Sequence, residues 1–109
     1  MKNCVKKKWG SYEVINEGKK YTVKKLIVEP DGQLSLQSHK GRSEHRLVAH
    51  GEAEVIINDE TFNLTENQHI FIPQGAKHRL ANRGNQTLIV IEMWFGEHLD
   101  ENDIKRYED

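Results

Sequence analysis

Short apolar runs separated by turn-forming residues recur along the whole chain, and this alternation restricts the fold more than any other feature. Runs such as YTVKKLIVE, AEVIIND and TLIVIEMWF are rich in Val, Ile, Thr and Tyr, which suit the half-buried positions of a pleated sheet. Gly, Pro, Asn and Asp stand between the runs, for example in PDG, HGE, NDE and PQGA. Many short strands with such turns at regular spacing predict an all-β fold, either an antiparallel sandwich or a small barrel.

Two stretches allow a more local prediction. VIINDETFNL is typical of a hairpin that turns around residues 58–60. Only the C-terminal stretch has a helical character, because Asp100 and Asn102 are suitable N-caps for a short helix through Ile104 and Tyr107. We therefore expect strands throughout, followed by a short C-terminal helix.

The length is that of one domain, so we expect a single domain over residues 1–109 with one hydrophobic core. Only 36% of the residues are apolar, and such a core is modest. Small domains leave apolar surface unburied and short strands leave sheet edges open. A homodimer that covers this surface is expected.

The charge balance excludes one class of partner. Sixteen Lys and Arg residues stand against 17 Asp and Glu residues, for a net charge of -1, whereas a nucleic-acid binder normally shows a clear basic excess. No apolar run approaches the roughly 20 residues of a membrane span, and the first residues lack the apolar run of a signal peptide. We expect a cytoplasmic protein without nucleic-acid or membrane partners.

Side chains that bind metals gather in LSLQSHKGRSEH and recur in KHRLAN. Because successive strand residues point to opposite faces, Gln37 and His39 share one face of their strand, and Glu44 shares a face with Arg46 but not with His45. One arrangement of the strands would bring Gln37, His39, Glu44 and His78 to a common interior point. Two imidazoles, a carboxylate and an amide oxygen suit a Zn, Fe, Mn or Ni ion with positions open for substrate.

Turn residues stand where this arrangement needs them. Gly41 lies between His39 and Glu44, where the chain has to reverse its direction. Pro73 and Gly75 predict a turn that delivers the strand of His78. Asn67, six residues before Pro73, is of the non-glycine type that best adopts a left-handed conformation.

These residues resemble the two metal motifs of the cupins. The pattern G-x4-Q-x-H-x4-E-x6-G, from Gly32 to Gly51, resembles the first motif, and P-x-G-x2-H-x3-N, from Pro73 to Asn82, resembles the second. Cupins usually have His where Gln37 stands, and the Gln-x-His variant is similar to the phosphomannose isomerase branch. Segments such as WGSYEVI, IPQGAKHRLAN and DENDIKRYED also resemble the C-terminal isomerase domain of bifunctional mannose-6-phosphate isomerase/mannose-1-phosphate guanylyltransferases, over roughly residues 7–109.

The resemblance implies a double-stranded β-helix, the jelly-roll barrel of the cupins. It also implies a divalent metal held by Gln37, His39, Glu44 and His78, with zinc as the first candidate and iron, manganese, nickel or cobalt as the others. The implied activity is an aldose-ketose isomerase that interconverts mannose-6-phosphate and fructose-6-phosphate. No Gly-rich nucleotide loop is present, so we exclude nucleotidyl transfer for this chain.

The chain departs from the family pattern at three places. The family often has consecutive histidines where His39, Lys40 and Gly41 stand, usually has an aromatic residue at the position of Arg46, and tends to continue with Tyr-Gly-Arg after the position of Asp109. Two alternatives therefore stand beside the isomerase: another metal-dependent cupin enzyme, such as a dioxygenase or a different isomerase, and a non-catalytic sugar-phosphate-binding cupin.

Four basic residues are candidates for binding the substrate. Arg46 lies on the face of Glu44, where its guanidinium would either clamp a phosphate or pair with a carboxylate. Lys24 and Lys25 alternate on one strand, so one of them faces inward, and Arg79 neighbours His78 with the opposite parity. The proton-transferring base stays open among a hydroxide on the metal, an inward lysine and His50.

Overall fold

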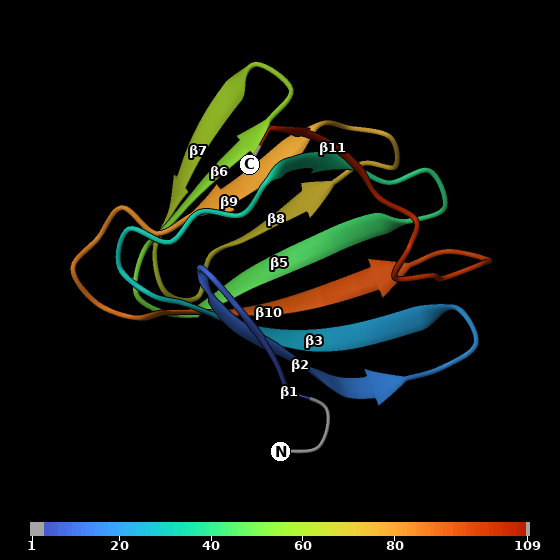
Figure 1. Cartoon of the computed structure of the whole chain (residues 1–109), viewed down its shortest axis with the longest axis horizontal. Helices are drawn as coiled ribbons and strands as arrows, with labels where there is room; N and C mark the ends of the chain where they lie inside the picture. The colour runs from blue at the N-terminus through green and yellow to red at the C-terminus, as the bar shows by residue number, and fades with distance from the viewer. Residues whose placement is uncertain (1–3, 109) are drawn as a thin grey trace.

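The computed structural model describes residues 4–108, which form eleven strands arranged in two antiparallel sheets. Figure 1 shows the strands running side by side across the molecule, with the second sheet above the first. The six-stranded sheet has the order β1 (Cys4–Lys7), β2 (Gly10–Glu17), β3 (Tyr21–Val28), β10 (Leu88–Phe95), β5 (Ser43–His50) and β8 (His69–Ile72). The five-stranded sheet has the order β11 (Lys105–Glu108), β4 (Leu36–Ser38), β9 (His78–Ala81), β6 (Ala53–Ile57) and β7 (Glu60–Leu64).

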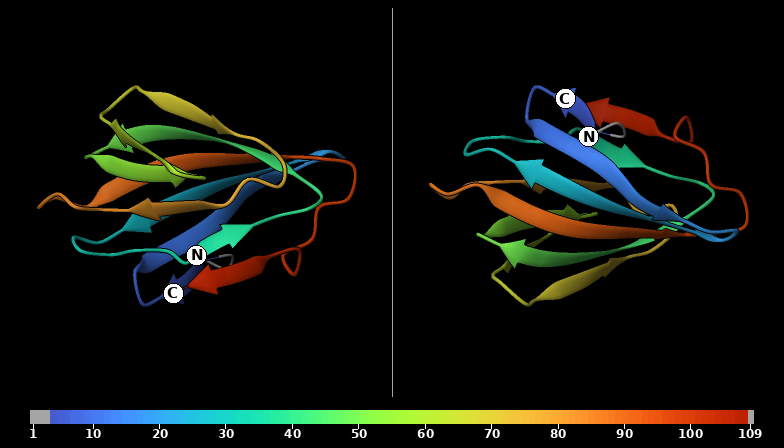
Figure 2. Two further views of the ribbon diagram at one scale, coloured as in Figure 1. Left: turned by 90° about the horizontal axis from the view of Figure 1, so that it is seen from above. Right: turned by 90° about the horizontal axis from the view of Figure 1, so that it is seen from below.

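The expected all-β fold is confirmed, but the expected short C-terminal helix is wrong. Residues 4–108 contain no helix, and Lys105–Glu108 forms the edge strand β11 instead. Arg106 pairs with Gln37 of β4, so this segment satisfies its backbone groups across the sheet rather than along itself. Asp100 caps only a turn, through a hydrogen bond of 2.9 Å from the amide of Asn102. Figure 2 shows β11 beside β4 in both views.

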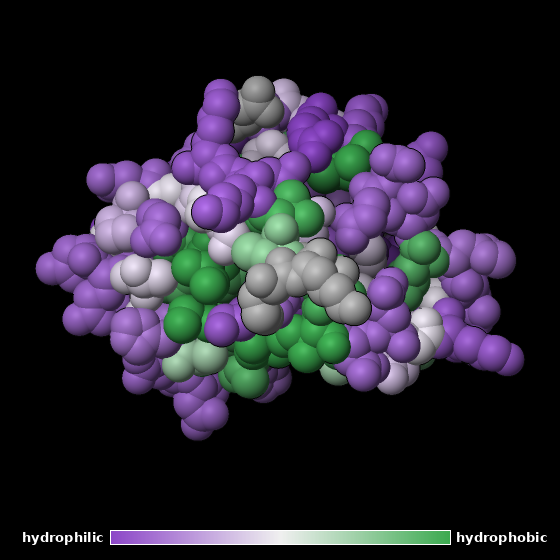
Figure 3. Space-filling view, turned by 60° about the horizontal axis from the view of Figure 1, so that its bottom comes forward, coloured by the Kyte–Doolittle hydropathy of each residue, from purple (hydrophilic) through white to green (hydrophobic). Residues whose placement is uncertain are grey.

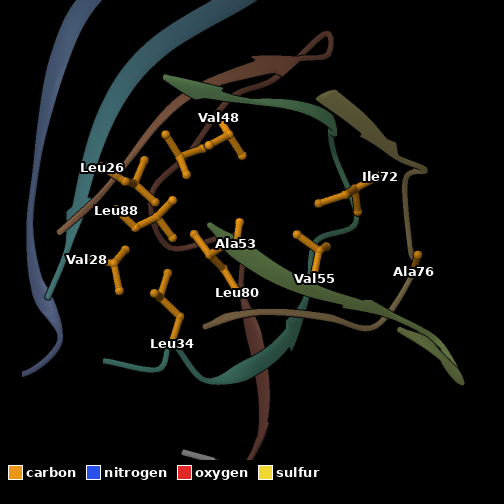
Figure 4. Close-up of a cluster of buried hydrophobic side chains, with 11 residues drawn as sticks. Leu26, Val28, Leu34, Val48, Ala53, Val55, Ile72, Ala76, Leu80 and Leu88 are labelled. Carbon is orange, nitrogen blue, oxygen red and sulfur yellow. The ribbon is translucent and has the colours of Figure 1, made fainter. Parts of the chain in front are cut away.

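Strand parity places the core between the two sheets. The inner face of the large sheet is built in cross-strand rows, in which Val90 of β10 lies between Leu26 of β3 and Val48 of β5. Val55 and Leu80 of the second sheet face this row and are at most 1% exposed. Figure 4 shows these apolar side chains pointing into one space between the sheets.

The same inner face changes from apolar to polar along the strands. Beyond the Leu26–Val90–Val48 row, the next row consists of Lys24, Glu92 and Arg46, and the row after it of Thr22, Trp94 and Glu44. All six of these residues are buried. The space between the sheets is therefore divided into an apolar end and a charged end.

The turns hold the backbone conformations that their residues favour. Asn58, in the expected hairpin between β6 and β7, has φ 54°, and Asn67 has φ 71°. Gly75, in the turn before β9, has φ 85°, which a residue with a Cβ rarely adopts. This turn directs His78 to the first position of β9.

The segment after β10 lies against the turn that follows His39. A Cβ on Gly96 would collide with the carbonyl oxygen of Gly41, so this close approach requires a glycine. The Asp103 carboxylate accepts hydrogen bonds from the amides of Lys40, at 2.9 Å, and Gly41, at 2.7 Å. The C-terminal segment thus fixes one wall of the charged end.

The part of the chain that the structure describes includes no helix long and apolar enough to cross a membrane.

The inner position of Val55 predicts a clear stability cost. Removal of two buried methyl groups in Val55→Ala should lower the free energy of unfolding by about 2 kcal/mol. Val55 is 0% exposed, whereas Val5 on β1 is 38% exposed. The control Val5→Ala should therefore cost less than about 0.5 kcal/mol in the same urea titration. Equal losses for the two variants would contradict the assignment of the core.

Candidate metal centre and its pocket

Three metal-binding side chains meet at the charged end of the space between the sheets. His39 follows β4, Glu44 belongs to β5 and His78 opens β9, so both sheets contribute. Nε2 of His39 lies 3.3 Å from Oε2 of Glu44, and Nε2 of His78 lies 3.6 Å from Oε1 of the same carboxylate. The three potential ligand atoms all lie within 4.8 Å of one another, and the three side chains are at most 2% exposed.

The hydrogen bonds of the two imidazoles orient them as ligands. Nδ1 of His39 lies 2.7 Å from the carbonyl oxygen of Asp103, and Nδ1 of His78 lies 3.0 Å from that of Ala76. A carbonyl only accepts, so each Nδ1 carries the proton and each Nε2 keeps a lone pair beside the Glu44 carboxylate. Nε2 of His78 is buried without a hydrogen-bond partner. This donor set suits a divalent ion, which would satisfy that nitrogen.

Gln37 lies next to this group. It is the cross-strand partner of His78 between β4 and β9. Its amide nitrogen donates to the carbonyl oxygen of Ser35 at 3.2 Å and contacts the Ser35 hydroxyl at 3.3 Å, so the amide oxygen is the atom that it offers to the site. The four residues expected to bind a metal are thus neighbours in space.

Two guanidinium groups hold Glu44 in its ionised form. Nε of Arg42 donates to Oε2 of Glu44 at 2.8 Å, and Nη2 of Arg46 donates to Oε1 at 3.1 Å. Burial by itself raises the pKa of Glu44, but the positive charges of Arg46 and Arg42 outweigh it, and the pKa of this carboxyl lies below its ordinary value. Glu44 is therefore a carboxylate whether or not a metal binds.

The two histidines are kept neutral. Burial, and after it the positive charge of Arg46, lowers the pKa of His78 to about 3. The pKa of His39 is also lowered, chiefly by burial, although the charge of Glu44 opposes this shift. Neutral imidazoles are the form that binds metals.

Glu92 of β10 is a second buried carboxylate in this wall. Its Oε2 accepts a hydrogen bond from Nε of Arg46 at 2.8 Å, and its Oε1 accepts one from the indole nitrogen of Trp94 at 2.8 Å. Nη1 of Arg46 is buried and has no partner. Arg46 therefore bridges Glu44 and Glu92, and its Nη1 remains an unpaired hydrogen-bond donor.

Lys24 is the lysine of its strand that faces inward. Its ammonium lies 3.9 Å from the ring centroid of Trp94 and 4.3 Å from that of Tyr12. It also forms an ion pair of 2.8 Å with Glu101, whose side chain is 55% exposed. The C-terminal segment thus meets the inner face of the large sheet across the pocket.

Lys24, Glu44, Glu92 and the two arginines line a cavity of about 570 Å³, and His39 and His78 lie behind Glu44 rather than in the lining. Six cationic side chains border it, against three carboxylates. The cationic ones are Lys7, Lys8, Lys24, Arg42, Arg46 and Arg106. Such a lining favours an anionic ligand beside the metal-binding group.

Three other candidates lie outside this cavity. Lys25 has the opposite parity to Lys24 and lies half-buried on the outer face of the large sheet. Arg79 points away from His78, as its opposite parity predicts. It donates to the carbonyl oxygen of Leu34 and forms an ion pair of 3.1 Å with Glu108. His50 is exposed at the end of β5, where Nδ1 bonds to the carbonyl of Thr87, so it is not positioned as a base. His45 faces outward and stacks on Phe71, as strand parity predicts.

Sequence reasoning missed Arg42, Glu92 and Asp103. Arg42 lies in the stretch after Gly41, two residues before Glu44, and shares the face of Glu44, which strand parity alone indicates. Glu92 has the parity of the buried Val90, so its polar side chain on an inner face was also a signal. The contact of Asp103 with residues 39–41 has no such signal, because it depends on a segment expected to be helical.

The comparison with protein families decides the classification of this chain. All of residues 1–109 match the model of the mannose-6-phosphate isomerase C-terminal domain. The chain belongs to this family. The alginate biosynthesis protein AlgA of Pseudomonas aeruginosa is 48% identical over 101 residues, which are 93% of this chain and 21% of that protein. The mannose-1-phosphate guanylyltransferase ManC of Salmonella typhimurium is 46% identical, with the same two shares.

The chain therefore spans about a fifth of the length of these curated relatives.

Solved structures of other proteins have the same fold. A cupin-2 domain protein of Rhodospirillum rubrum has a TM-score of 0.78 at 14% identity, over 91% of this chain and 66% of that one. The oxalate decarboxylase of Lactobacillus farciminis has a TM-score of 0.82 at 19% identity, over 94% of this chain and 32% of that one. The expected cupin fold is confirmed.

The neutral buried histidines predict an acid-sensitive fold in the metal-free protein. An unfolded histidine gains a proton near pH 6.5, whereas folded His78 stays neutral down to about pH 3. The unfolded state thus binds more protons between these values, and the free energy of unfolding falls as the pH falls. His78 alone should contribute a slope that rises toward about 1.4 kcal/mol per pH unit as the pH falls below about 5.5, measured by urea unfolding in EDTA between about pH 7 and 5.

Two variants test this assignment. His78→Gln should reduce the slope, because one of the two buried neutral imidazoles is gone. His69→Gln changes an exposed histidine on β8 and should leave the slope as it is. A slope that is the same in His78→Gln and in the wild type would contradict the neutral state of His78.

Proposed function

We propose that this chain is a metal-dependent isomerase that interconverts mannose-6-phosphate and fructose-6-phosphate. The observation that carries the proposal is the cluster of His39, Glu44 and His78, whose carboxylate lies in the wall of a pocket bordered mainly by cations. Membership of the mannose-6-phosphate isomerase C-terminal family supports this substrate class.

His39, Glu44 and His78 would hold the metal, with the amide oxygen of Gln37 as a fourth ligand. Zinc is the first candidate, and iron, manganese, nickel and cobalt are the alternatives. A divalent ion supplies Lewis-acid stabilisation of the negative charge that develops on the sugar oxygens during the reaction. The carbonyl oxygens of Asp103 and Ala76 orient the two histidines for this role.

The cationic side chains of the pocket would bind and orient the sugar phosphate. Nη1 of Arg46 is a buried donor without a partner, so it can donate to a ligand without breaking an existing hydrogen bond. Lys24 adds a second positive charge beside Trp94. Lys7, Lys8 and Arg106 also border the cavity, which supports a phosphate as the charged group.

Glu92 is the group that we propose to carry the proton. The isomerisation removes the proton from C2 of the aldose and returns it to C1, while a hydroxyl proton moves from O2 to O1. Glu44 is occupied as a ligand, and the ammonium of Lys24 is already paired with Glu101 and lies over two aromatic rings. Glu92 is then the buried carboxylate of the pocket that remains able to accept a proton.

An activity assay with matched variants tests this function. Protein loaded separately with zinc, cobalt, manganese or iron(II) should convert mannose-6-phosphate into fructose-6-phosphate. Glu92→Gln should lower kcat by about 100-fold or more with little change in KM, because general-base catalysis has this magnitude. His78→Gln should lose metal and activity together, whereas Arg83→Gln, a change in an exposed ion pair, should keep both.

The outcomes separate the alternatives. Absence of fructose-6-phosphate with every metal would refute the isomerase. Tight binding of mannose-6-phosphate without turnover would instead support a non-catalytic sugar-phosphate-binding cupin. Oxygen uptake by the iron(II) protein would support a dioxygenase.

We also propose a homodimer formed by the outer face of the large sheet. Met93 of β10 lies in a cross-strand row with Val23 of β3 on one side and with His45 and then Phe71 on the other. Phe71 is 48% exposed, Met93 40% and Phe95 53%. Figure 3 shows hydrophobic residues gathered on the face seen from below, with hydrophilic ones around them. A second copy of the chain offers the same face, so a two-fold contact would cover both.

A cytoplasmic location remains a prediction from the sequence.

Light scattering tests the dimer. The wild type should have about twice the mass of the 12.7 kDa chain. The double variant Phe71→Glu with Met93→Glu should be monomeric, because charges would be buried in the contact. The control Thr61→Glu adds a charge to an exposed position of β7 in the other sheet and should stay dimeric. A monomeric wild type would contradict the proposal.

A further inference from the structure

Arg42 contacts two of the three side chains of the candidate metal centre at once. Its Nε donates to Oε2 of Glu44 at 2.8 Å, and its Nη2 lies 3.1 Å from Nε2 of His39. Its plane lies over Trp94, 3.4 Å from the ring centroid, and Nη1 reaches the carbonyl oxygen of Asp100 at 3.4 Å. The side chain is 6% exposed, so Arg42 is buried, and each of its three guanidinium nitrogens has a polar contact.

The contact with His39 conflicts with metal binding. Because Nδ1 of His39 donates to the carbonyl of Asp103, Nε2 has one lone pair as its only acceptor site. That lone pair accepts a hydrogen bond from Arg42 here, and the same lone pair would have to bind a metal. The two uses of Nε2 exclude each other.

The charges of the site also disfavour a metal ion while Arg42 is in this position. Arg42 and Arg46 balance Glu44 and Glu92 in the buried cluster. A divalent ion would add two positive charges beside both guanidinium groups. Withdrawal of Arg42 from His39 and Glu44 relieves part of this repulsion, whereas Arg46 is held by Glu92 as well and does not contact His39.

We infer that Arg42 is an internal cation that competes with the metal for His39 and Glu44, so that the metal binds only when Arg42 withdraws. This inference rests on the metal centre of the proposed function and adds a control of its occupancy. The free energy needed to withdraw Arg42 lowers the apparent metal affinity. Trp94 and the pocket lie beside the guanidinium, which makes this side chain the link between metal binding and the ligand site.

Direct metal titration tests the inference without any substrate. Zinc and cobalt affinities are measured by calorimetry on the full chain after treatment with EDTA, and cobalt binding also by its visible absorption. Arg42→Gln should tighten both metals by about tenfold or more, since the lost hydrogen bonds to a charged group have that magnitude. Arg42→Lys keeps the positive charge but not the forked contact, and it should tighten them less, though measurably.

Two controls separate the contact from general effects. Arg83→Gln makes the same change of charge at an exposed position, and it should leave the metal affinity unchanged. Zinc should change the Trp emission of the wild type, because the cation on the Trp94 ring moves, and this change should be smaller in Arg42→Gln. Thermal unfolding shows whether each variant is folded, and Arg46 remains as a partner of Glu44 in all of them.

The outcomes are distinguishable from those of the activity assay. Metal affinity in Arg42→Gln that equals or falls below that of the wild type overturns the competition, and so does an equal gain in Arg83→Gln. Absence of metal binding in every variant overturns the metal centre and this inference together. If Arg42→Gln binds the metal more tightly and the wild type has no isomerase activity, the competition is supported and only the proposed reaction is refuted.

Discussion

The buried carboxylate of Glu44 is the charge on which the rest of the site depends. It is 1% exposed, and a carboxylate removed from water to this extent is stable only with close partners. Arg42 and Arg46 supply these partners, and two neutral imidazoles face the remaining sides. Glu92 in turn pairs with Arg46, which extends the cluster across the large sheet.

This cluster explains why the interior has two ends of different character. The strands β3, β5 and β10 each place apolar residues at one end of their inner face and charged ones at the other. The antiparallel register aligns charged residues with charged ones and apolar residues with apolar ones. Lys24, Glu92 and Arg46 thus form one row beside the apolar row of Val90. The apolar end supplies stability through packing, and the charged end is free to serve as a binding site.

The C-terminal segment completes the site from the other side. Asp103 orients His39 with its carbonyl oxygen and holds the turn at Lys40 and Gly41 with its carboxylate. Glu101 pairs with Lys24 across the pocket. A segment more than 60 residues from His39 in the sequence therefore positions a candidate ligand of the metal.

The sequence by itself determined the features that depend on local periodicity. The alternation of apolar and polar residues predicts the strands, and parity separates Glu44 and Arg46 from His45, because side chains of a strand alternate whatever its neighbours are. The motif residues that resemble the cupins also predicted which four side chains lie together, and family membership and fold are in agreement with that resemblance.

Only the tertiary structure decided how distant strands meet. The choice between Lys24 and Lys25, the pairing of Arg46 with Glu92, and the position of Asp103 at His39 depend on register between segments far apart in the chain. The C-terminal residues form β11 rather than a helix because β4 offers backbone partners, and tertiary hydrogen bonds outweigh a weak local propensity. The contact of Arg42 with His39 is of the same kind, since it exists only where the turn, β5 and the C-terminal segment are packed together.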